Sequence, residues 1–124
     1  MTFSAAITGL VLLQLKHLLA DYFLQSSYIF LNKGRYGHPG GLIHAGIHVV
    51  LTLLVLVFLG VGTVVMAGII IAEFIVHYHI DWTKEKITRK ASLDPSKARF
   101  WNLHGTDQAL HHLTYVAIIW WLAN

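Results

Sequence analysis

Four long apolar segments follow one another along the chain, separated by shorter polar stretches. Each segment is close to the roughly 20 residues that an α-helix needs to cross a bilayer. The short uncharged turn around residues 60–63 makes the second and third segments an antiparallel hairpin. The pattern predicts an all-α integral membrane four-helix bundle, formed as one domain over residues 1–124, with spans at about 4–28, 42–60, 62–82 and 105–123.

The polar stretch 83–104 carries a helix signal of its own. Asp94 followed by Pro95 is typical of an N-cap and a first helical position. Phe100 and Trp101 follow among basic residues, a combination that suits the membrane–water interface. The sequence therefore predicts a short interfacial helix near residues 95–102.

Composition supports the membrane assignment. The chain is 56% hydrophobic, has a mean hydropathy of +0.60 and contains only 12% charged residues, about half the charge of an ordinary soluble domain. The first apolar segment lacks the basic start and the small-residue cleavage site of a signal peptide, so we expect it to be retained as a span. The absence of cysteine excludes disulfides and thiolate metal ligands.

The basic residues are placed asymmetrically. Eight of the nine Lys and Arg residues lie in the two loops 32–41 and 83–104. In a four-span protein these loops are on one side, and the positive-inside rule puts them in the cytoplasm with both termini external. The pI of about 9.3 then reflects topology and contact with lipid headgroups. The alternative is that the basic loops bind the phosphate of a substrate. We therefore expect membrane lipids, and no nucleic acid, among the partners.

A stripe of polar and ionisable residues runs along each apolar segment. In the third segment, Glu73, His77 and Asp81 are four residues apart and therefore lie on one face of a helix. Ionisable groups inside a membrane are costly, and by default they mark function. The candidate metal ligands on the four stripes are His17, Asp21, His44, His48, Glu73, His77, Asp81, Asp107 and His111.

The stripes converge in depth when the helices alternate in direction and rise about 1.5 Å per residue. Three aspartates and His44 fall about one turn nearer the cytoplasmic face than the main histidine layer, and Glu73 falls about one turn deeper. Facing histidine and carboxylate groups in a bundle core predict a metal site. The histidines that fall at one depth, one from each segment, are His17, His48, His77 and His111.

These ligands suffice for two divalent metal ions. Imidazole and carboxylate without thiolate suit zinc, which we favour, with iron or manganese as alternatives. The remaining histidines lie in loops or off the stripes, and we do not expect them to bind metal. The alternative without metal is a buried polar network that only fixes the register of the helices.

The favoured function is a metal-dependent hydrolase acting on an amphiphilic or phosphate-bearing substrate at the cytoplasmic leaflet, because bound metal lowers the pKa of water. Glu73 and Asp81 are the candidate general bases. Lys16, the only basic residue within a span, either pairs with Glu73 or Asp21 or receives an anionic substrate. Two alternatives stay open: a divalent-metal or proton transporter, which would require a homo-oligomer, and an oxygen-using di-iron enzyme.

Four motifs carry a family resemblance: Lys16–Gln25, His44–His48, Glu73–Asp81 and Asp107–His111. Together they resemble the small four-span membrane proteins of bacteria and phages that are catalogued as the family of unknown function DUF3307. The resemblance implies a four-span protein of the bacterial inner membrane and brings no activity with it. A looser likeness in ligand type links the chain to membrane-bound metal-dependent hydrolases, and the stretch 108–112 is similar to a histidine box of fatty-acid desaturases.

Overall fold

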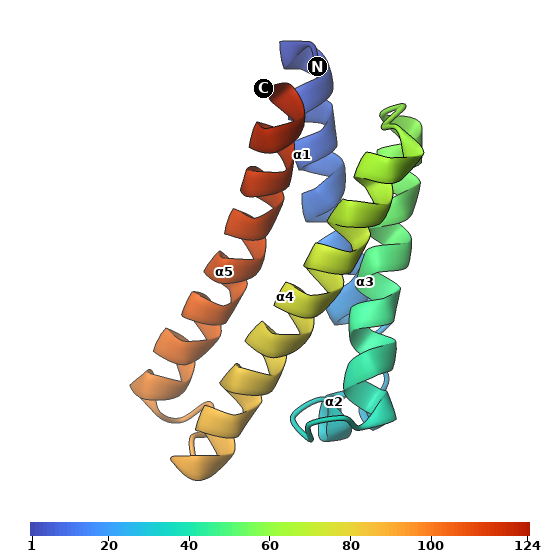
Figure 1. Cartoon of the computed structure of the whole chain (residues 1–124). Helices are drawn as coiled ribbons and strands as arrows, with labels where there is room; N and C mark the ends of the chain where they lie inside the picture. Colours follow the sequence, from blue (N-terminus) through green and yellow to red (C-terminus); the bar gives the residue numbers. More distant parts are fainter.

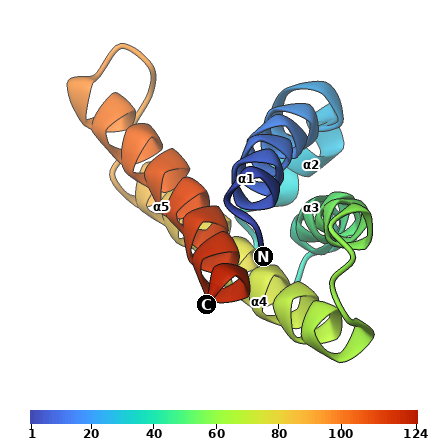
Figure 2. The same ribbon diagram turned by 90° about the horizontal axis from the view of Figure 1, so that it is seen from above.

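The computed structural model describes all 124 residues and contains helices only, which confirms the all-α prediction. Four long helices run antiparallel and form a ring in the order α1, α3, α4, α5 (Figure 1, Figure 2). Both chain termini lie at one end of the bundle, called here the terminal end, and the α4–α5 loop lies at the opposite loop end. The elements are α1 (Phe3–Leu18), the π-helix η1 (Leu19–Phe23), α2 (Ser27–Asn32), α3 (Pro39–Phe58), α4 (Thr63–Lys90) and α5 (Ala98–Ala123).

The first long helix is shorter than the predicted span of 4–28. It begins at a side-chain cap, where Thr2 Oγ1 accepts the backbone N–H of Ala5 at 3.2 Å. It continues directly into η1 and ends at Phe23. Ser26 then caps the separate helix α2 by accepting the N–H of Ile29. The chain turns here because the Ser26 cap begins a new helix.

Helices α3 and α4 form the predicted antiparallel hairpin. His38 caps α3 by accepting the N–H of Gly40 at 3.0 Å, and Pro39 follows at the first helical position. Gly60 adopts a φ of +69° in the connecting turn, a conformation that glycine reaches without steric cost. Helix α4 does not end near residue 82 but continues to Lys90, because the charged residues beyond 82 are good helix formers in water.

The predicted interfacial helix at 95–102 is wrong. Asp94 does not cap a helix; its carboxylate accepts the backbone N–H and the hydroxyl of Ser96 within a turn. The next helix starts at Ala98 and runs without a break to Ala123. Phe100 and Trp101 therefore form the first turn of α5. The weakest helix former that follows is Gly105, and a single glycine costs only about 1 kcal/mol in a helix.

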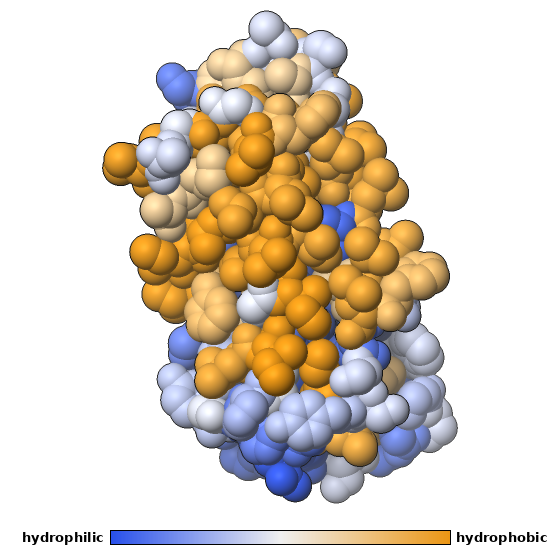
Figure 3. Space-filling view, turned by 90° about the vertical axis from the view of Figure 1, so that its right-hand side faces the viewer, coloured by the Kyte–Doolittle hydropathy of each residue, from blue (hydrophilic) through white to orange (hydrophobic).

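Three helical stretches are long and apolar enough to cross a membrane: Phe3–Phe23, Pro39–Phe58 and Thr63–Lys90. Helix α5 has 26 residues, which is sufficient length, but polar residues in its first half lower its hydropathy. The fourth span therefore stays a prediction. Figure 3 shows a broad apolar band over the helices, with polar side chains gathered mainly at the loop end.

The predicted stripes form the inner faces of the long helices. Every fourth residue of α5 is buried from Asp107 to Ile119, and α4 follows the same spacing from Ile69 to Glu85. Toward the terminal end, an apolar cluster fills the space between α1, α3 and α5. This apolar cluster consists of Leu13, Val55, Tyr115 and Ile119.

Candidate metal centre

One histidine from each long helix contributes to a layer of imidazole rings, as the depth argument predicts. The ring centroid of His77 lies 3.8 Å from that of His48 and 4.1 Å from that of His111. The ring of His17 lies 5.2 Å from His48 and 5.3 Å from His111. All four side chains are buried. The predicted meeting of these four histidines is confirmed.

Asp21 enters the cluster from the π-turn that follows α1. The side-chain amide of Gln25 donates to the backbone carbonyl of Asp21 at 3.2 Å and supports this turn. Asp21 Oδ1 lies 2.9 Å from Nε2 of His48 and 3.3 Å from Nε2 of His44. Single π-turns of this kind occur frequently at functional sites. Here the turn brings one carboxylate oxygen to two histidines of α3.

Asp81 on α4 supplies the second central carboxylate. Its Oδ2 lies 3.2 Å from Nε2 of His44 and 3.3 Å from Nε2 of His77. Its Oδ1 lies 3.4 Å from Nε2 of His111. Asp81 is thus surrounded by imidazoles from three positions, and His44 lies between Asp21 and Asp81.

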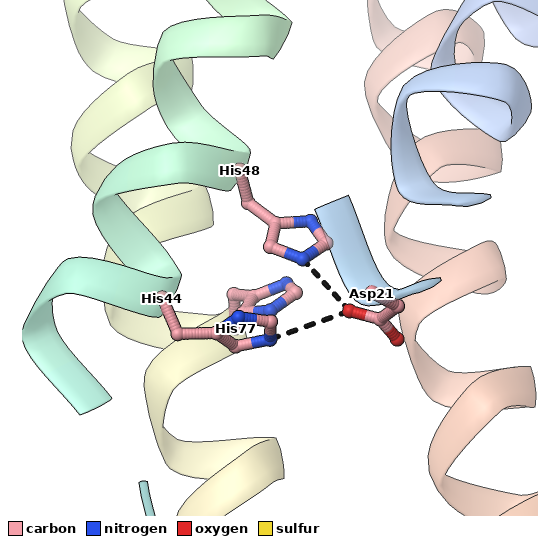
Figure 4. A group of neighbouring side chains, drawn as sticks. All are labelled: Asp21, His44, His48 and His77. Atoms are coloured by element: carbon pink, nitrogen blue, oxygen red, sulfur yellow. Dashed lines mark hydrogen bonds and ion pairs between the residues drawn. The ribbon is translucent and has the colours of Figure 1, made fainter. Parts of the chain in front are cut away.

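The potential ligands form two groups that can each hold a metal ion. The first ligand group, drawn in Figure 4, consists of Asp21, His44, His48 and His77. The second ligand group consists of His77, Asp81 and His111. The ligand atoms of each group lie within 4.8 Å of one another. Because His77 belongs to both groups, the two candidate metal positions are adjacent.

Several contacts in this arrangement are too poorly aligned to be ordinary hydrogen bonds. Nε2 of His44, His77 and His111 and Oδ1 of Asp107 are buried without a hydrogen-bond partner, although most buried polar atoms in proteins are paired. The three imidazole nitrogens lie 3.2 to 3.4 Å from oxygens of Asp81. Two atoms bound to one metal at about 2.1 Å, with angles of about 90–109° between them, lie roughly 3.0–3.4 Å apart. The geometry therefore fits atoms that face a common cation.

Glu73 lies in neither ligand group. Its Oε1 accepts a hydrogen bond from Lys16 Nζ at 2.6 Å and one from the Thr52 hydroxyl at 3.0 Å. Lys16 Nζ also lies 3.4 Å from Nδ1 of His48 and 4.3 Å from the centre of the Tyr115 ring. The sequence allowed Asp21 or Glu73 as the partner of Lys16, and in the structure that partner is Glu73. The catalytic roles of Lys16 and Glu73 stay predictions.

His17 borders the ligand groups without belonging to them. Its Nδ1 lies 2.8 Å from the Tyr115 hydroxyl, and its Nε2 lies 3.1 Å from Oε1 of Gln108 and 3.2 Å from Oδ2 of Asp21. Gln108 also donates to Oδ2 of Asp107 at 3.2 Å. Partners of this kind orient metal ligands in known sites. In this arrangement, His17 and Gln108 hold the carboxylates of Asp21 and Asp107 in place.

The remaining histidines, which the sequence does not propose as ligands, lie outside both ligand groups. His38 caps α3, and His79 is exposed on the outer side of α4. His104 stacks on Phe100 near the loop end. His112 is half-buried and belongs to neither group.

Lys33 is a residue of the site that sequence reasoning missed. The sequence assigns it to topology with the other basic loop residues, yet it is only 7% exposed and its Nζ lies 3.7 Å from Oδ1 of Asp81. Burial lowers the pKa of Lys33, but the nearby carboxylates of Asp81 and Asp21 outweigh burial and raise that pKa above its ordinary value. The sequence contains no signal that distinguishes Lys33 from Arg35, which is exposed. Only the folding of the loop buries Lys33 beside the site.

The fold and the site define a class of protein: a helical bundle with three helices apolar enough to cross a membrane and with buried histidine–aspartate groups that can hold metal ions. The chain belongs to the family described as protein of unknown function DUF3307, whose family model matches residues 10–124. The predicted family resemblance is thereby confirmed. No curated protein and no solved structure matches the chain.

Proposed function

We propose that the protein is a membrane-embedded hydrolase with two divalent metal ions, acting on an amphiphilic substrate at the cytoplasmic leaflet. One observation carries the proposal: three buried imidazole nitrogens without hydrogen-bond partners face the carboxylates of Asp21 and Asp81. A polar network that only fixed helix register would be expected to pair these atoms with one another.

The charges of the site also favour bound cations. Glu73 is paired with Lys16 at 2.6 Å, and Glu85 at the loop end is paired with Lys84 at 2.7 Å. The three further carboxylates, those of Asp21, Asp81 and Asp107, have one ion pair with a lysine between them, that of Asp81 with Lys33 at 3.7 Å. Charges that are buried require compensation, and divalent metal ions supply it together with the ligand geometry already described.

The two ligand groups suit different roles. A neutral imidazole has one free lone pair, so His77 serves one metal ion at a time. With His77 in the first group, that site has four protein ligands, a number typical of a closed site, and the second site has Asp81 and His111 and leaves room for water or substrate. Metal ions bound there would lower the pKa of a bound water and polarise the scissile ester group. Zinc fits the donor set of histidine and aspartate, as do iron and manganese.

Asp107 is the best placed general base. Its Oδ1 has no hydrogen-bond partner and lies 3.6 Å from Nε2 of His111, a ligand of the open second group. In the proposed reaction, the water oxygen bonds to the carbonyl carbon or phosphorus of the substrate while the ester bond breaks. Asp107 accepts the proton of that water and returns it to the leaving alkoxide, so that an acid and an alcohol are formed.

An apolar groove supports an amphiphilic substrate. A groove of about 580 Å³ lies between α4 and α5 and is lined by apolar residues including Ile80, Ile87 and Leu110, with Lys84 and Asp107 among its polar residues. An acyl chain in this groove would place its polar head beside Asp107. Toward the terminal end, the apolar cluster closes the space between α1, α3 and α5, which favours hydrolysis over transport through a single chain.

Removal of metal tests the proposal. Detergent-purified protein is expected to contain close to two divalent ions per chain by elemental analysis and to hydrolyse a long-chain ester or phosphate ester. Treatment with a chelator should abolish turnover, and addition of zinc, iron or manganese should restore it. Asp107→Asn should keep the metal and lose turnover at least a hundredfold, in the range expected for general-base catalysis. Wild-type protein that contains no metal would contradict the proposal.

The orientation in the membrane is a separate prediction. The chain has no cysteine, so single cysteines can be labelled without background. Lys90→Cys at the loop end should react with a membrane-impermeant thiol reagent only after cells are opened, because basic loops stay in the cytoplasm. Asn124→Cys should react in intact cells. Labelling of both positions from the same side would mean that α5 does not cross the membrane. The predicted four-span orientation would then be wrong.

A further inference from the structure

Lys33 differs from every other basic residue near the site. It is the C-cap of α2, its side chain is 8% exposed, and its Nζ lies 3.7 Å from Oδ1 of Asp81. This distance is too long for a hydrogen bond. The ammonium thus stands beside the second ligand group with donors to spare.

The position of Lys33 is fixed by the packing of its loop on α4. The Tyr78 hydroxyl accepts the N–H of Gly37 at 2.6 Å, and the guanidinium of Arg89 donates to the carbonyl of Leu31 at 3.1 Å. A Cβ added to Gly34 would lie 2.6 Å from Cβ of Glu85, so the loop approaches α4 as closely as glycine permits. A loop held at three points presents Lys33 in a defined place.

The other basic side chains do not place an ammonium with free donors beside the second ligand group. Lys16 lies on the opposite side of the histidine layer and donates to Glu73. Lys84 donates to Glu85 at 2.7 Å. Arg35 and Lys90 are exposed. Lys33 is therefore the cation available to a ligand that enters the second group from the loop end.

The charge of the site indicates which ligand this is. Two divalent ions and Lys33 carry five positive charges, and Asp21, Asp81 and Asp107 carry three negative charges. The difference is two positive charges, which matches the nearly doubly negative charge of a phosphate monoester at neutral pH. A carboxylic ester, which is uncharged, would leave the site unbalanced.

We propose that Lys33 binds the phosphate group of the substrate, so that the substrate class is a phosphate monoester rather than an acyl ester. The proposal rests on the metal-dependent hydrolase proposed above. A lysine binds phosphate as a point charge with three donors, and one of these can be spared for Asp81. Lys33 is in this sense a substrate-binding residue, positioned by the loop that covers the second ligand group.

Binding of inorganic phosphate to the metal-loaded full chain tests this proposal. Lys33→Gln should weaken phosphate binding at least tenfold, measured by calorimetry, and raise KM for a phosphate monoester more than it lowers kcat. Lys33→Arg should restore most of the affinity. Lys90→Gln removes the same charge from an exposed site and should change nothing. The metal content of all three variants should be equal to that of wild type.

Other outcomes distinguish the phosphate-binding role of Lys33 from the metal-dependent hydrolase proposed above. If Lys33 only neutralises carboxylates, Lys33→Gln will bind metal more tightly and phosphate unchanged, and the proposal is wrong. Wild-type protein that binds no phosphate also overturns it. Phosphate binding that requires Lys33 but no metal would support the anion site and overturn the metal-dependent hydrolase. A comparison of dodecyl phosphate with inorganic phosphate shows whether the natural ligand is a lipid phosphate or free phosphate. Ile80→Trp fills the groove, so it should weaken the binding of dodecyl phosphate and leave the binding of inorganic phosphate unchanged.

Discussion

Replacing His77 with alanine is expected to weaken metal binding more than any other single substitution in the site. His77 is the one residue that belongs to both ligand groups, and its side chain is only 2% exposed. Loss of residues that merely orient a ligand commonly weakens metal binding tenfold to a hundredfold, so loss of a ligand common to both groups should exceed that range. Elemental analysis of the purified variant should find at most half of the wild-type metal, and turnover should disappear with it.

His79→Ala is the matched control. His79 lies two residues further along the same helix, but it is exposed and its ring nitrogens contact the Tyr36 hydroxyl and the carbonyl of Ile75. The control variant should retain full metal and turnover. Circular dichroism should show equal helix content in both variants. If His77→Ala keeps all of its metal, the histidine layer is a polar network that fixes the register of the helices, and the proposed function is wrong.

The site could be predicted from sequence because helical spacing and antiparallel connection together set depth. Histidines far apart in sequence, such as His17 and His111, lie 5.3 Å apart between ring centroids, because each is at the expected height on its helix. The depth argument rested on a repeat of four residues, which is a property of each helix alone. The hairpin of α3 and α4 followed from the short uncharged turn between them.

Features that depend on contacts between helices could not be predicted in the same way. The π-turn that aims Asp21 has no sequence pattern of its own. Glu73 continues the stripe of His77 and Asp81, yet it lies outside both ligand groups because Lys16 and Thr52 pair with it. Spacing identifies the face on which a residue lies, but not which partner from another helix reaches it first.

The predicted ends of the helices were wrong for a different reason. Apolar runs show where a helix is able to cross a membrane, but helices do not end where the apolar run ends. Helix α4 continues to Lys90, and α5 starts at Ala98, well before its apolar part. The position of Lys33 could not be predicted because it depends on the docking of its loop against Tyr78 and Glu85, residues more than 40 positions away in the sequence.

Breaking the Lys16–Glu73 pair is expected to be the most destabilising change in the bundle. The two side chains are 4% and 1% exposed, so removal of either leaves a buried charge without a partner, at a cost of roughly 3–5 kcal/mol. Lys16→Met and Glu73→Gln should each lower the unfolding temperature in detergent by at least about 10 °C. The double variant Lys16→Met with Glu73→Leu removes both charges, and its stability should return close to that of wild type.

The double variant also decides the role of the pair in function. Lys16 Nζ lies 3.4 Å from Nδ1 of His48, so the loss of Lys16 should weaken metal binding in the first ligand group tenfold to a hundredfold by releasing that ring. The second ligand group does not include His48 and should keep its metal. If the stable double variant still hydrolyses substrate when metal is supplied in excess, the pair positions His48 and the predicted catalytic roles of Lys16 and Glu73 are wrong. If turnover is lost while both metals are bound, Glu73 or Lys16 takes part in the reaction itself, and Asp107→Asn would then be expected to retain activity.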